Sequence, residues 1–218
     1  MTTILKPFLV VSMFILSSGS GFSQYKAIGI TDEEFKTIQL IEANQKSNEW
    51  CLAAVIQMTL QFYGVSIDQK EIAAHIFGLD TNGKIVKLNM KQKDIKNALD
   101  GWVIEKNGHQ FKINAEYFNG FIGKIILNEL QKKHPIILVG YHDTPSGQTG
   151  HPMLLTEIDF TGVKGKAMYT ELITRIFEID PYPGSYNTTG GVEYLNENAT
   201  EVMDNVKNTW VIKGAFIN

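Results

Sequence analysis

The longest uninterrupted apolar pattern in the chain lies at residues 50–63, which contain no Gly or Pro and are rich in Ala, Leu, Met and Gln. Apolar residues occupy most faces of this segment, and Gly64 follows it, a residue type common just after a helix. The pattern predicts a central helix packed on several sides. Only Gln57 and Gln61 are expected to face solvent.

Three other segments of the first two thirds of the chain have helical patterns. A capping box formed by Ser66 and Gln69 predicts a helix that continues to Phe77, and a similar signal predicts a short helix over 89–99. An amphipathic pattern over 118–133, stopped by a proline, predicts the last of these helices. The first half of the chain is therefore expected to be mainly helical.

The second half changes to short apolar or alternating runs bounded by Gly, Pro and Asn, which is typical of strands. Strands are predicted at 102–105, 110–113, 136–141, 151–158, 174–179 and 209–216. Residues 142–150 are expected to form a loop, and the polar residues 185–208 an excursion over the surface. Helices followed by antiparallel strands predict an α+β fold rather than alternating βαβ units.

Residues 1–23 have the features of an export signal. Lys6 precedes the apolar run 7–16, which is short for a membrane span, and small residues follow before an expected cleavage after Ser23. The alternative is that the segment stays attached as a short membrane anchor. With the signal removed, residues 24–218 are expected to form a single domain, secreted or periplasmic, with no integral membrane segment.

Composition excludes several classes of function. The chain has 218 residues, of which 44% are hydrophobic, and 20 Lys and Arg residues stand against 23 Asp and Glu residues, for a net charge of −3. This balance lacks the basic stripe of a nucleic-acid-binding protein and the basic amphipathic face of a membrane-surface protein. Neither nucleic acid nor a lipid surface is an expected partner.

The chain contains a single cysteine, Cys51, at the point where a polar loop becomes the predicted central helix. An exported protein with one cysteine has no intramolecular disulfide, so the thiol is left free. Unpaired N–H groups and the helix dipole favour a thiolate at this position. Cys51 is therefore a candidate nucleophile, and the alternative is a buried, inert side chain.

A thiol nucleophile needs a base, and the base needs a third group that orients it. His151 opens a predicted strand, whereas its competitor His142 lies at the other end of the preceding loop, so the rigid position favours His151. Asp180 ends the next predicted strand, from which a carboxylate reaches His151 if the two strands pair. Gln45 is a candidate donor to an oxyanion. A metal site is a minor alternative, because the paired spacings of zinc ligands are missing.

These residues, in this order, resemble the papain-like cysteine peptidases. The resemblance rests on Gln45 six residues before the cysteine of Trp50-Cys51, on Gly150-His151 and on 179–181, an Ile-Asp-Pro sequence. More narrowly, the chain is similar to the bacterial stand-alone group that includes bacteriocin-leader-processing peptidases and secreted effector proteases of plant pathogens. The resemblance implies a papain-like fold whose central helix is led by the nucleophile, with an antiparallel sheet after it.

The resemblance also implies roles. Cys51 would be the nucleophile, His151 the general base, Asp180 the orienting acid and Gln45 the oxyanion donor, acting on a peptide or protein substrate without a cofactor or metal. Two alternatives remain open at this point. Glu49 and the Leu that follows Cys51 favour a catalytically silent domain that binds peptides, and the same residues would also serve a transamidase or amidase.

Overall fold

The computed structural model describes residues 25–31, 33–34, 44–47, 49–87, 90–144, 147–161, 173–181 and 193–217. The predicted export signal, residues 1–23, lies outside these ranges. Five helices are present in the described part of the chain: α2 (Cys51–Phe62), α3 (Gln69–Phe77), α4 (Gln92–Leu99), α5 (Gly123–Gln131) and α6 (Ala199–Asn205).

The described strands form one sheet in which all neighbouring strands are antiparallel. They are β1 (Tyr25–Gly29), β2 (Val103–Lys106), β3 (His109–Asn119), β4 (Ile136–Thr144), β5 (Gly147–Thr161), β6 (Ile173–Asp180), β7 (Glu193–Asn198) and β8 (Val206–Ile217). Their order is β2-β3-β8-β4-β5-β6-β7, with β1 paired to β5. The α+β class predicted from the sequence is confirmed.

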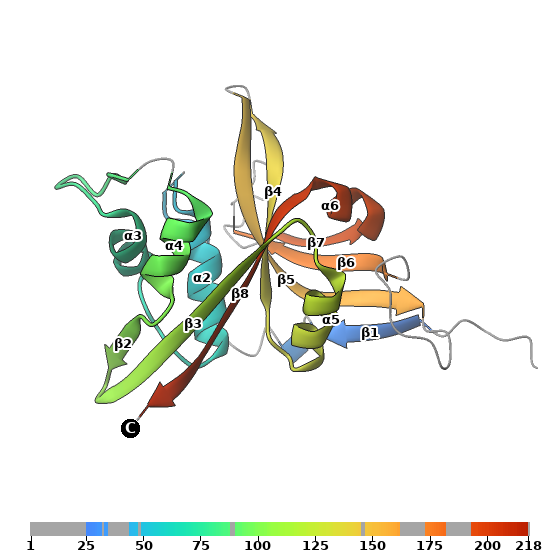
Figure 1. Cartoon of the computed structure of the whole chain (residues 1–218), viewed down its shortest axis with the longest axis horizontal. Helices are drawn as coiled ribbons and strands as arrows, with labels where there is room; N and C mark the ends of the chain where they lie inside the picture. The colour runs from blue at the N-terminus through green and yellow to red at the C-terminus, as the bar shows by residue number, and fades with distance from the viewer. Residues whose placement is uncertain are drawn as a thin grey trace, which may run out of the picture.

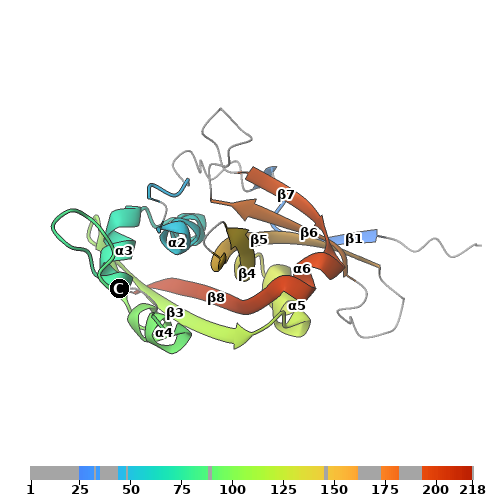
Figure 2. The ribbon, with the colours of Figure 1, turned by 90° about the horizontal axis from the view of Figure 1, so that it is seen from above.

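The sheet twists strongly, so that β3 and β8 run obliquely to β5 and β6 (Figure 1). Helices α2, α3 and α4 gather at the end of the sheet where β2 lies, whereas β1, β6 and β7 extend toward the other end. Viewed from above, α2 lies close to the middle of the molecule, beside β5 (Figure 2). The central helix thus stands where the helical and strand-rich halves meet.

Helix α2 has almost the predicted bounds, and its interior faces are completely covered. Ile56, Met58 and Leu60 have no exposed surface. Full burial of one such side chain contributes about 1.5–3 kcal/mol. Gly64 follows with φ of +80°, a left-handed conformation that glycine adopts without strain. One expectation was wrong: Gln57 is buried rather than facing solvent.

The other helices begin later than predicted. Helix α3 is capped by Asp68, whose carboxylate accepts the Lys70 N–H at 2.8 Å, so this aspartate replaces the predicted serine cap. Helix α4 begins at Gln92, not at residue 89, which lies outside the described ranges. Helix α5 is restricted to 123–131 because the preceding residues extend β3 to Asn119, where pairing with β8 continues to the end.

Two segments predicted as irregular contain regular structure. The predicted loop 142–150 is mostly a continuation of β4 and β5, which pair as far as Thr144 and Gly147. The predicted excursion 185–208 includes β7, which pairs with β6, and α6, whose first turn is capped by Asn198. Strand β1 was not predicted, because its five mixed residues have no clear period. For the strands, backbone pairing with a neighbouring strand outweighed weak local patterning.

Two apolar clusters cover opposite faces of the central strands. Ile137 of β4 and Leu154 of β5 belong to the cluster under α2, α3 and α4. Ile136 and Leu138 belong to the cluster that includes residues of α5 and α6. Because successive strand residues point to opposite faces, this alternation shows that β4 is buried on both sides. The strands that lead into the candidate site are therefore rigid.

Candidate active site

Strand register brings His151 and Asp180 together. Leu154 of β5 pairs with Ile179 of β6, so the next step of the register places Asp180 opposite Met153. His151 lies two residues from Met153, on the same face, and diagonal neighbours on one face are within reach of long side chains. The His151 Nε2 atom lies 2.8 Å from Asp180 Oδ1. Both side chains are mostly buried.

Cys51 approaches the same histidine from helix α2, and its side chain is hydrogen-bonded to His151. It is the first residue of the helix and is partly exposed. Within the described residues, no side chain caps this helix, and the first turn contains no carboxylate. The N–H groups of the first turn and the positive end of the helix dipole are thus left to favour an anion at the thiol.

The electrostatic surroundings of His151 favour its protonated form. Burial by itself lowers the pKa of the imidazole, but hydrogen bonds and charge interactions with Asp180 and Cys51 outweigh it and raise the pKa to about 9, from an ordinary value of 6.5. Near neutral pH the ring is therefore an imidazolium, and its two partners are the Asp180 carboxyl group and the Cys51 thiol group. A thiolate–imidazolium pair is the reactive form of a cysteine nucleophile.

Gln45 lies in a loop that is attached directly to the end of β6. Its side chain is buried, and its backbone N–H donates to the carbonyl of Pro181 at 2.8 Å. Pro181 immediately follows Asp180 in the sequence, so this hydrogen bond attaches the Gln45 loop next to the residue that carries the carboxylate. Within the described part of the chain, Gln45 Oε1 accepts no hydrogen bond. The structure thus connects the four elements that carry the predicted residues: the Gln45 loop contacts the end of β6, and His151 of β5 contacts both Asp180 of β6 and Cys51 of α2.

The competing histidine, His142, lies on β4 opposite Thr149 of β5, whereas His151 lies opposite Gly140. Cys51 and Asp180 both contact His151, whereas the side chain of His142 lies outside the part of the chain that the structure describes. The catalytic roles of Cys51, His151, Asp180 and Gln45 remain predictions.

Sequence reasoning missed two buried amides behind the site. Gln57 and Gln69 are both buried, and the Gln69 Nε2 group donates to Gln57 Oε1 at 2.9 Å. The only signal in the sequence was a polar residue in an otherwise apolar helical segment. That signal does not distinguish a solvated glutamine from one with a buried partner.

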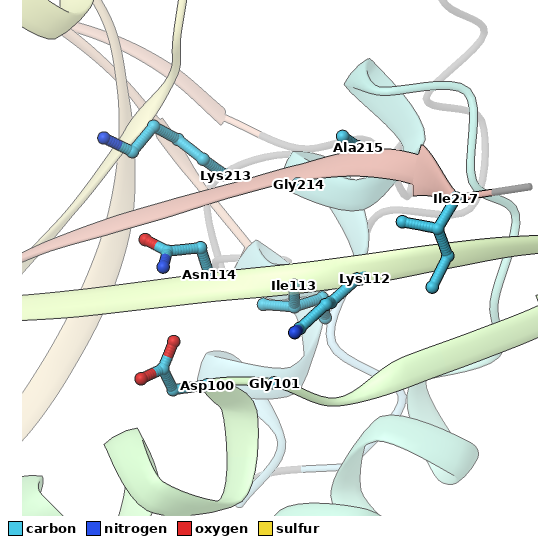
Figure 3. Close-up of a pocket in the computed structure, with 9 residues that line it drawn as sticks. All are labelled: Asp100, Gly101, Lys112, Ile113, Asn114, Lys213, Gly214, Ala215 and Ile217. Carbon is cyan, nitrogen blue, oxygen red and sulfur yellow. The ribbon is translucent and has the colours of Figure 1, made fainter.

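The described residues contain no group of three or more His, Cys, Asp and Glu side chains placed to hold a metal ion. A cavity of about 510 Å³ lies elsewhere, between β3, β8 and the turn after α4, and Lys112, Asn114 and Lys213 are among its lining residues (Figure 3). None of the four candidate site residues lines it.

None of the described helices is both long and apolar enough to span a bilayer.

Comparison with known proteins agrees with this chemistry. No curated protein matches the chain. Residues 37–205, well over half of the sequence, match the Peptidase_C39 like family, and this range includes all four candidate residues. The chain therefore belongs to the Peptidase_C39-like family, a family related to the papain-like cysteine peptidases.

Proposed function

We propose that this protein is an exported cysteine peptidase with a papain-like arrangement, which hydrolyses peptide bonds through Cys51, His151 and Asp180. The observation that carries the proposal is the pair of contacts made by His151, to Asp180 at 2.8 Å and to the only thiol of the chain. Family membership supports a peptidase-like activity. Residues 1–23 are proposed to direct export, and residues 24–218 to form the secreted or periplasmic enzyme.

In the proposed reaction, the Cys51 thiolate attacks the carbonyl carbon of a peptide bond. The resulting oxyanion accepts hydrogen bonds from the Gln45 side-chain amide and the Cys51 backbone N–H. The His151 imidazolium then protonates the leaving amine, and the C–N bond breaks to give a thioester. His151, now neutral, takes a proton from water, the hydroxide attacks the thioester, and the thiolate–imidazolium pair is restored.

The test is turnover of a peptide library by wild-type protein and by Cys51→Ala, with products identified by mass spectrometry. We expect cleavage by the wild type and none by the variant. The Cys51→Ala change removes one sulfur from a partly exposed position, so the variant is expected to stay folded. Equal product formation by both proteins would reject the proposal.

A catalytically silent peptide-binding domain is the second candidate, and Glu49 is the residue that favours it. This carboxylate precedes the thiol by two residues and is exposed, so water and salt screen its charge. Alkylation with iodoacetamide near pH 7 separates the candidates. A peptidase is expected to react much faster than a free thiol, whereas a silent domain reacts at the ordinary rate. Trapping with an added amine acceptor distinguishes hydrolysis from acyl transfer.

A further inference from the structure

We propose that Gln69 is a positioning residue for the loop that carries Gln45 (residues 44–47), acting on Gln45 through the backbone on either side of it. The inference rests on the proposed function, because the loop has a catalytic role only if Gln45 contacts an oxyanion. Gln69 is the first residue of α3, twenty-four positions after Gln45 in the sequence, and its side chain has no exposed surface.

Both backbone neighbours of Gln45 bind the same side-chain amide. The Lys46 N–H donates to Gln69 Oε1 at 3.0 Å, and Gln69 Nε2 donates to the Asn44 carbonyl at 2.7 Å. One side chain thus holds the backbone carbonyl just before Gln45 and the backbone N–H just after it.

The backbone of Gln45 is also held. The Gln45 N–H itself has a different partner, because it donates to the Pro181 carbonyl at 2.8 Å. Gln45 is thus fixed between the start of α3 and the end of β6. Because its side-chain oxygen accepts no hydrogen bond within the described residues, the position of its amide depends largely on this backbone support.

A second buried amide is hydrogen-bonded to the first. Gln57 Oε1 accepts from Gln69 Nε2 at 2.9 Å, and Gln57 Nε2 donates to the Ile67 carbonyl at 2.7 Å. Both glutamines are at least nine-tenths buried, so water does not readily replace a lost partner. Gln69 therefore has one bond to Gln57 within the core and two bonds to the loop, and only the latter two hold the backbone around Gln45.

This geometry predicts a specific defect in Gln69→Met, which keeps the size of the side chain and removes both loop bonds. Displacement of an oxyanion donor by about 1 Å costs roughly a hundredfold in rate. We expect kcat to fall about 10- to 100-fold with KM nearly unchanged. Alkylation of Cys51 by iodoacetamide forms no oxyanion, so its rate is expected to stay within about twofold of wild type.

Gln57→Met is the matched control. It removes a buried amide from the same core and keeps the two bonds between Gln69 and the loop. We expect it to lower Tm about as much as Gln69→Met but to leave kcat within a few-fold of wild type. Gln45→Ala is expected to show the same separation of turnover from alkylation as Gln69→Met.

A measurement that does not depend on activity keeps the two proposals distinguishable. Backbone hydrogen exchange at Lys46 is expected to be at least about tenfold faster in Gln69→Met than in wild type, and unchanged in Gln57→Met. If the wild type cleaves no peptide but Lys46 exchange follows this pattern, the proposed function fails, whereas the support of the loop backbone by Gln69 stands. If Gln69→Met does not fold, Gln69→Glu serves instead, because it keeps the acceptor for Lys46 and loses the donor to Asn44.

Two outcomes would overturn the inference. One is wild-type turnover and wild-type Lys46 exchange in the Gln69 variant. The other is a loss of turnover matched by an equal loss of alkylation and reproduced by Gln57→Met, which would indicate general damage to the core rather than a displaced oxyanion donor.

Discussion

Two histidines of this protein each lie against a carboxylate, yet only one of the pairs lies beside the thiol. His151 Nε2 is 2.8 Å from Asp180, and His134 Nδ1 is 2.7 Å from Glu129. As isolated pairs the two are nearly identical. A short contact between an imidazole and a carboxylate is therefore not evidence of chemistry by itself.

The first difference between the pairs is the charge around the carboxylate. Glu129 also accepts from Asn128 at 3.0 Å and Lys132 at 3.1 Å, and the Lys213 ammonium lies 3.6 Å away. Although burial raises the pKa of Glu129, hydrogen bonds from His134 and Lys132 and the nearby lysines lower it overall. This carboxylate is neutralised by several partners and ties α5 to β8.

The second difference is the end of the central helix that each pair meets. His151 contacts Cys51 at the start of α2, where the helix favours an anion. The His134 ring lies 6.0 Å from the ring of Tyr63, which caps the other end of the helix. Burial and the charge of Glu129 raise the pKa of Tyr63, so this phenol stays neutral. The comparison supports the proposal of a reactive pair at the start of α2 and a structural pair at its end.

The largest expected effect comes from removing each imidazole. His151→Ala is expected to lower kcat/KM about 10³- to 10⁴-fold, because both the base and the proton donor to the leaving amine are lost. His134→Ala is expected to leave kcat/KM within a few-fold and to lower stability by about 1–2 kcal/mol. Peptide turnover and urea unfolding of the two variants provide the measurement. Similar loss of turnover in both would remove the distinction between the pairs.

Replacing each carboxylate by its amide is expected to separate function from stability. Asp180→Asn still holds the ring but removes the charge that stabilises the imidazolium, so kcat should fall about 10- to 100-fold. Glu129→Gln leaves two lysines and a histidine around a neutral group and should lower the unfolding free energy by about 2–3 kcal/mol. Steady-state kinetics and urea denaturation test the two effects. A stability loss confined to Asp180→Asn would contradict the assignment.

The raised pKa of His151 predicts a loss of stability in alkaline solution. Because the pKa is about 9 in the folded protein and 6.5 in the unfolded chain, this contribution is complete below pH 6.5 and is lost as pH rises through 9. Its size is at most about 3 kcal/mol. Urea unfolding at pH 6, 8 and 10 should show the loss in wild type and not in His151→Ala. Turnover should also decline above pH 9, as the imidazolium disappears.

The smallest effect is expected at Lys213. Its ammonium is partly exposed and 3.6 Å from Glu129, so Lys213→Gln should lower stability by less than about 1 kcal/mol and leave turnover unchanged. Increasing salt concentration should reduce the difference from wild type. A change in peptide turnover would show that the pair at the far end of α2 influences the thiol.

Local patterns were sufficient for the long central helix, for the α+β class and for the choice of Cys51, His151, Asp180 and Gln45 as candidates. Each of these depends on signals carried by neighbouring residues, such as an apolar period or a histidine opening a strand. The limits of β4 and β5 were not predictable in the same way. The extension of β4 beyond residue 141 and of β5 before residue 151 depends on pairing between the two strands, which polar residues do not signal locally.

The sequence by itself determined a single thiol at a helix start, a histidine and an aspartate on successive strands, and the family to which the chain belongs. Only the tertiary structure decided that the register from Leu154 to Ile179 brings His151 to Asp180, and that Gln69 holds the backbone on both sides of Gln45. These contacts join residues far apart in the sequence. Their formation depends on strand register and helix packing, which are properties of the whole fold rather than of any segment.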